Sequence, residues 1–129
     1  MSRATVSIFV FGIYAMIAGL GFIFIPNILL SLFSLPETDE VWIRVVGLLV
    51  FFVGGYYLVA ARHNLTPFYR ASAYFRVPFA LGLILFVLLG YTGPGLVIFA
   101  TLDLLGAAWT WWGLRAEYST EILASRGSV

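Results

Sequence analysis

Four apolar runs, each about as long as a membrane-spanning helix, take up most of this sequence. A helix of about 20 apolar residues covers the ~30 Å hydrocarbon core of a bilayer. The pattern therefore predicts an all-α fold, a polytopic membrane protein whose four transmembrane helices form an up-down bundle in one domain, residues 1–129. The predicted spans are residues 6–25, 40–61, 68–90 and 96–114, and a polar tail follows at 115–129.

The composition argues against a soluble domain of this length. Of the residues, 62% are hydrophobic and only 10% are charged, whereas soluble domains carry about 25% charged residues. A small domain leaves much of its surface exposed, so it could not hide this much apolar side chain from water. A bilayer must therefore be the solvent for most of the chain.

The first run has a competing interpretation, because a positive residue, Arg3, precedes it as in a secretory signal peptide. The apolar core of a signal peptide is only about 7–15 residues long and ends near an A-x-A-like site. Residues 6–25 form a longer run and contain no such site. We therefore expect this run to be retained as a helix.

Prolines mark three further features. Residues 27–35 are apolar, lie between two prolines and are too short to span, so we expect them to lie on the membrane surface. Pro78 falls inside the third run and predicts a kink there. The tail at 115–129 is polar, and we expect it to be frayed or to form a short surface helix.

The arginines orient the chain. Positive residues that flank transmembrane helices concentrate on the cytoplasmic side. Five arginines fall on one side of the four-span topology, and the acidic stretch 36–40 falls on the other. We therefore predict a multi-pass protein of the cell (inner) membrane with cytoplasmic N- and C-termini. The five are Arg3, Arg62, Arg70, Arg115 and Arg126.

Glycines recur at intervals of seven residues in three of the four runs. Seven residues are close to two helical turns, so the two glycines of each pair share one helix face. Small residues on one face let helix backbones approach closely in a bilayer. The pattern predicts a compact bundle. The pairs are Gly12 and Gly19, Gly47 and Gly54, and Gly106 and Gly113.

Three ionisable residues, Arg44, Arg76 and Asp103, fall inside the predicted spans. A charge at the bilayer centre costs about 2.5–3.5 kcal/mol on insertion scales, so such residues usually have partners. One interpretation is an ion pair, Arg44–Asp103 or Arg76–Asp103, that fixes how the fourth helix docks. Another is a polar site, where Asp103 takes a proton or a cation, or the arginines hold an anionic head group. In a third interpretation, the arginine side chains extend along their helices to the polar interfaces of the membrane.

The predicted inner loop carries Arg62 and His63, and Arg70 follows it. These residues can set the topology and contact anionic lipid. Alternatively they form a site for a phosphate or carboxylate, because guanidinium groups bind such anions bidentately.

Several function classes lack the residues they need. The chain has no cysteine and a single histidine, which excludes disulfides, thiolate catalysis, Cys-ligated metals and a bis-His haem within one chain. No hydrolase triad, HExxH or phosphate-binding loop is present, so we assign no catalytic residue and no metal ligand. The net charge of +1 gives no indication of nucleic-acid binding. The sequence does not identify a cofactor.

Aromatic residues gather toward the predicted inner ends of the spans. Such residues favour the level of the lipid head groups, so an interfacial belt is the simpler interpretation. A stacking site for a flat ligand such as a quinone is the alternative. The residues are Tyr56, Tyr57, Phe68, Tyr69, Tyr74, Trp109, Trp111 and Trp112.

Four short motifs follow one another along the chain. An Arg-x-x-Gly opening at residues 44–47 is followed by an Ala-Ala-Arg exit at 60–62, a Gly-Pro turn at 93–94 and an acid, Asp103, in the last span. In this the chain resembles the small bacterial DoxX-like four-helix membrane proteins. That resemblance implies the four-helix fold and an accessory subunit near quinone-linked redox chemistry. The group more often carries Glu where this chain has Asp103.

The function expected from these observations is binding. We expect a non-enzymatic inner-membrane protein that binds a lipid-like or quinone-like ligand, or a partner subunit, through Arg44, Arg76 and Asp103, with membrane lipids around it. The alternative is a small homo-oligomeric transporter or channel that uses Asp103. An intramembrane enzyme is a third possibility.

Overall fold

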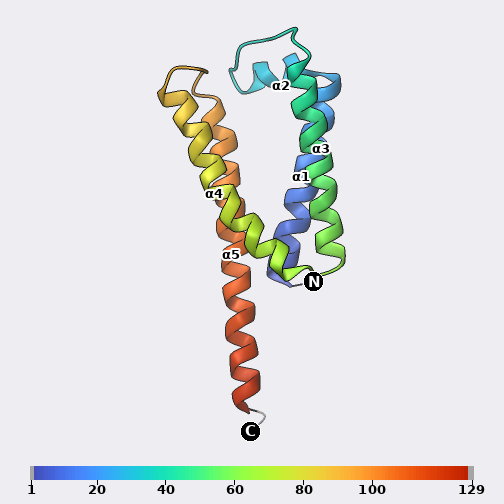
Figure 1. The fold of residues 1–129 in the computed structure, drawn as a ribbon, viewed down its shortest axis with the longest axis vertical. Helices are drawn as coiled ribbons and strands as arrows, with labels where there is room; N and C mark the ends of the chain where they lie inside the picture. The colour runs from blue at the N-terminus through green and yellow to red at the C-terminus, as the bar shows by residue number, and fades with distance from the viewer. Residues whose placement is uncertain (1, 128–129) are drawn as a thin grey trace.

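The computed structural model describes residues 2–127, and the regular structure in this range is entirely helical (Figure 1). The prediction of an all-α fold is confirmed for these residues. Their five helices are α1 (Arg3–Phe24), α2 (Pro26–Leu32), α3 (Trp42–Arg62), α4 (Thr66–Leu88) and α5 (Leu96–Gly127).

Within the described residues, α1, α3, α4 and α5 are long and apolar enough to cross a membrane. They begin within a few residues of the four predicted starts, and α1, α3 and α4 also end close to the predicted ends. Pro78 lies inside α4, which remains one helix and changes direction along its length in Figure 1.

The last helix differs from the expectation. α5 does not end at Arg115 but continues to Gly127 as a single helix of 32 residues. The tail, expected to be frayed or to form a short surface helix, is therefore a continuation of α5 as far as the described residues extend. Two causes are evident. Residues 116–126 contain no proline or glycine, which favours continuation of the helix, and the Glu117 side chain is held by a hydrogen bond from the backbone N–H of Ala4 in α1, at 3.3 Å.

The seven-residue glycine spacing packs α1 against α3. The two helices are antiparallel, and Gly12 lies against Gly54 as Gly19 lies against Gly47. A Cβ on Gly19 would lie 2.6 Å from the carbonyl oxygen of Gly47, and one on Gly54 would lie 2.7 Å from that of Gly12. Both distances are too short for a real Cβ, so the close packing depends on glycine.

The helices form two pairs, α1 with α3 and α4 with α5, which meet near the start of α1. There the α5 backbone at Gly113 approaches Ala4 so closely that a Cβ would lie 2.6 Å from the Ala4 nitrogen. Toward α2 the two pairs diverge (Figure 1). The helices thus do not form the compact bundle that the glycine pattern predicts, and the large side chains Phe75 and Phe79 of α4 face the gap between the pairs.

The segment between α1 and α3 closes the wide end between the pairs. α2 buries Pro26 and Leu30, and the ring of Phe33 packs on Phe99 of α5, with 4.4 Å between centroids. The backbone at Gly95 lies directly against the Phe33 carbonyl, where no side chain would fit. Residues expected to lie only on a surface therefore pack against α5.

The distribution of side chains is the reverse of that in a soluble protein. Large apolar residues are exposed along the outer faces of all the long helices. The described residues that are buried are mostly small or polar, as the alanines along every long helix illustrate. The buried polar and charged residues are Thr5, Ser7, Ser72, Arg76, Asp103 and Thr110.

Candidate functional site

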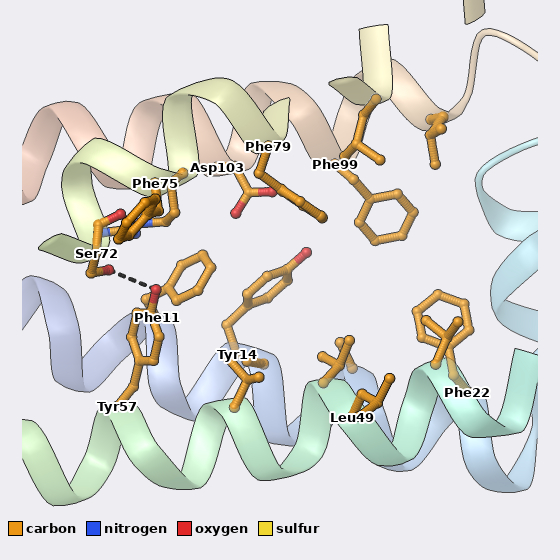
Figure 2. Close-up of a pocket in the computed structure, with 18 of the residues that line it drawn as sticks. Phe11, Tyr14, Phe22, Leu49, Tyr57, Ser72, Phe75, Phe79, Phe99 and Asp103 are labelled. Atoms are coloured by element: carbon orange, nitrogen blue, oxygen red, sulfur yellow. Dashed lines mark hydrogen bonds between the residues drawn. The ribbon is translucent and has the colours of Figure 1, made fainter. Parts of the chain in front are cut away.

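A cavity of about 570 Å³ lies between the two helix pairs (Figure 2). Volumes of about 300–1,000 Å³ are typical of small-molecule sites. Its walls are mostly aliphatic and aromatic side chains of all five helices, and Phe11, Tyr14, Leu49, Phe79 and Phe99 are examples. Arg76 of α4 and Asp103 of α5 are its charged lining residues in the described part of the chain.

The cavity opens sideways, between α3 and α4. Three of its lining residues are largely exposed: Leu49 is 62% exposed on α3, and Phe75 and Phe79 are 73% and 57% exposed on α4. At the α2 end the lining residue Leu30 is buried, and the lining residue Phe99 packs on Phe33. A molecule can therefore enter along the side of the helices.

Arg76 is held at the narrow end of the cavity and is only 5% exposed. Its Nη2 donates to Thr110 Oγ1 at 2.8 Å, and its Nε donates to the Ser72 carbonyl oxygen at 3.4 Å. The guanidinium also lies over two rings, with its Cζ 4.5 Å from the centroid of Phe11 and 5.7 Å from that of Tyr57. These contacts fix its orientation and partly balance its charge, because ring faces attract cations.

The third nitrogen of this guanidinium differs from the other two. Nη1 of Arg76 is buried and has no hydrogen-bond partner in residues 2–127. It lies beside Gly106, where a Cβ would approach it to 2.7 Å. A buried donor without an acceptor costs about 1–3 kcal/mol, and more when it is charged. The site is therefore set up to receive an acceptor atom.

Asp103 is the second charged group of the cavity. It is 9% exposed, and in Figure 2 its carboxylate points into the space between the helix pairs. Neither a hydrogen bond nor a salt bridge joins this carboxylate to the side chains and backbone of residues 2–127. No salt bridge joins Arg76 to Asp103 within residues 2–127, and Arg76 instead donates to Thr110 and Ser72.

Arg44 forms no salt bridge with Asp103 within residues 2–127 either. Arg44 is exposed, and its Nη1 donates to the carbonyl oxygen of Ile23 near the end of α1. The last carbonyls of a helix have no partners within the helix and carry partial negative charge, which suits an arginine. Arg44 is not among the residues that line the cavity.

Arg62, His63 and Arg70 lie where α3 ends and α4 begins, and their side chains are exposed. They do not line the cavity. Their predicted contact with anions or lipid stays a prediction.

Sequence reasoning missed the residues that hold Arg76. Thr110 binds the guanidinium and lies 2.8 Å from the Ser7 hydroxyl, and the Ser72 hydroxyl donates to Tyr57 at 2.6 Å. A signal was present: Ser72 precedes Arg76 by four residues and Thr110 follows Asp103 by seven, so each shares a helix face with a charge. Gly106 was read as a packing residue, and it instead makes room for Arg76.

Comparison of the chain with protein-family models, with curated proteins and with solved structures finds no match. The resemblance to DoxX-like proteins therefore stays a prediction. The argument for function rests on the cavity and on its two charged residues.

Proposed function

We propose that this chain is a multi-pass protein of the bacterial inner membrane, with α1, α3, α4 and α5 as its transmembrane helices in up-down order. The support is the reversed distribution of side chains. Contiguous exposed apolar surface on this scale marks contact with lipid or protein, and ionisable groups within membrane spans face the protein interior. Arg76 and Asp103 do face the interior, toward the cavity.

The orientation we propose has both termini in the cytoplasm. It is supported by the clustering of positive side chains at one end of the molecule, where α1 begins and α3 leads into α4. Arg3, Arg62 and Arg70 belong to this end, and Arg115 follows the contact of Gly113 with Ala4. Positive residues favour the cytoplasmic side.

The role that fits the cavity best is non-enzymatic binding of a lipid-like or quinone-like molecule. An apolar cavity with a sideways opening suits a ligand that diffuses within the bilayer. One observation carries the proposal: two oppositely charged side chains, Arg76 and Asp103, line the same apolar cavity, and no salt bridge joins them within residues 2–127. Such groups are stable in hydrocarbon only when something binds them.

Native mass spectrometry of the mildly solubilised protein tests this role. We expect a discrete small molecule bound to the wild type and reduced in Arg76→Gln and in Asp103→Asn. Two controls match these changes outside the cavity. Arg44→Gln removes an exposed arginine, and Asp39→Asn removes an exposed acid of the loop before α3. Both controls should retain the ligand.

A wild-type protein free of any small molecule would contradict the binding role, as would equal loss in the controls. The transporter alternative has a separate readout. Solute flux in proteoliposomes that disappears in Asp103→Asn would assign the cavity to transport instead.

A further inference from the structure

We propose that the cavity selects an amphiphile whose head carries no net charge and offers both a hydrogen-bond acceptor and a donor. The acceptor binds the guanidinium of Arg76, and the donor binds the carboxylate of Asp103. This inference rests on the binding role proposed above and names the chemical class of the ligand.

The first argument is the charge balance of the site. Arg76 and Asp103 contribute one positive and one negative charge, and the tyrosines Tyr14 and Tyr57 are the other side chains with acidic protons among the described cavity residues. An anionic head on Arg76 would also face the carboxylate of Asp103. A cationic head on Asp103 would likewise face Arg76. Repulsion between like charges is strong in a medium of low dielectric constant, so both kinds of ion are disfavoured.

The second argument comes from the surroundings of Arg76. Its guanidinium already lies over the rings of Phe11 and Tyr57, whose faces offset part of the positive charge. Its Nη2 and Nε are hydrogen-bonded to Thr110 and Ser72. What remains unmet is a hydrogen bond at Nη1. A hydroxyl or carbonyl oxygen in the cavity can accept a hydrogen bond from the guanidinium without adding a negative charge beside Asp103.

The third argument is the shape of the apolar part. The cavity runs along α5 from Asp103 to Leu96, about 10 Å at the 1.5 Å rise per residue of a helix. Its walls here are apolar side chains such as Phe22 and Phe99. This length holds the first part of a hydrocarbon tail, and a longer tail can leave between α3 and α4, past Phe79.

Three probes with equal hydrocarbon chains test the inference: monolauroylglycerol, which is uncharged, laurate and dodecyltrimethylammonium. Binding of each is measured to the full-length protein in phosphatidylcholine nanodiscs, with empty nanodiscs as the correction for partitioning into lipid. We expect the wild type to bind monolauroylglycerol at least about tenfold more tightly than either ion, a difference of ~1.4 kcal/mol.

The variants should change which of the three probes binds most tightly. Asp103→Asn leaves Arg76 as the single charge, so laurate should become the preferred probe. Arg76→Gln leaves Asp103, so dodecyltrimethylammonium should be preferred. The controls Arg44→Gln and Asp39→Asn should keep the wild-type ranking.

Each other outcome has a definite meaning. Wild-type preference for laurate or for dodecyltrimethylammonium overturns the uncharged-head inference and leaves the binding role standing. Binding of none of the three also overturns the inference, and native mass spectrometry of the wild type then decides whether the binding role stands. Because the wild-type ranking alone separates these outcomes, the inference stays testable even if a variant does not fold.

Discussion

Arg76 and Gly106 fit together across the contact between α4 and α5: a Cβ on Gly106 would lie only 2.7 Å from Nη1 of Arg76. The glycine thus leaves space for the one guanidinium nitrogen that has no hydrogen-bond partner in residues 2–127. This relationship allows the position of Nη1 to be changed without removing a charge.

Gly106→Ala should therefore weaken ligand binding. The nearest atom to the added methyl group is the end of a flexible side chain, so the guanidinium shifts and the helices need not. We expect ligand affinity to fall about tenfold, or ~1.4 kcal/mol, and thermal stability to fall as well, because the displaced guanidinium strains its hydrogen bonds to Thr110 and Ser72. Gly82→Ala on α4 is the control, because its Cβ meets nothing within 4 Å. Equal affinities of the two variants would contradict the role of Nη1.

Gly54→Ala should destabilise the contact between α1 and α3. Its Cβ would lie 2.7 Å from the Gly12 carbonyl oxygen and 2.8 Å from the Met16 nitrogen, both of which are backbone atoms. Overpacking of this kind costs roughly 1–3 kcal/mol. The neighbouring Gly55→Ala is a matched control with nothing within 4 Å of its Cβ. Thermal unfolding followed by circular dichroism measures the difference, and similar unfolding temperatures would argue against the close packing.

Glu117→Gln should lower stability by about 0.3–1 kcal/mol. The Glu117 carboxylate accepts a hydrogen bond from Ala4 in the first turn of α1, where the helix dipole favours a negative charge. Glutamine can keep the hydrogen bond but loses the charge. Glu121→Gln, one turn further along α5 at an exposed position, is the control and should have no effect. The same unfolding measurement applies, and the loss should shrink at high salt.

Labelling of single cysteines tests the orientation, because the natural chain has none. In intact cells an impermeant maleimide should label Asp39→Cys, in the loop before α3, and not Ser119→Cys, on α5. Both positions are exposed, so Ser119→Cys should react once the membrane is permeabilised. The reverse pattern would place both termini outside the cytoplasm.

The sequence predicted the elements of this fold better than their arrangement. Apolar runs of about 20 residues identify long apolar helices without any knowledge of their neighbours, since length and composition suffice. The seven-residue spacing also placed Gly12, Gly19, Gly47 and Gly54 on packed faces. The same spacing gave no warning about Gly106, because a small residue can face either a backbone or a large side chain.

The pairing of charges could not be predicted from depth alone. Arg44 and Arg76 both lie within apolar runs, yet Arg44 turns to the carbonyl of Ile23 whereas Arg76 turns into the cavity. What separates them is the rotation of each helix about its axis and the supply of nearby hydroxyl groups. Thr110 provides such a group for Arg76, and tertiary structure brings it there from α5.

The paired glycines of α1 and α3 also determine which half of the molecule can move. A glycine of α1 faces a glycine of α3 at two positions along the contact. If one helix slides along the other, the side chain of a neighbouring residue moves into the space that a glycine leaves and meets the backbone of the other helix. The glycines face each other again only when the shift equals the spacing between them. With seven residues between glycines, that next register is about 10.5 Å away. The α1–α3 pair is thus locked against small translations. A change in the width of the cavity is therefore expected to alter the angle between the α1–α3 pair and the α4–α5 pair rather than the packing within α1–α3.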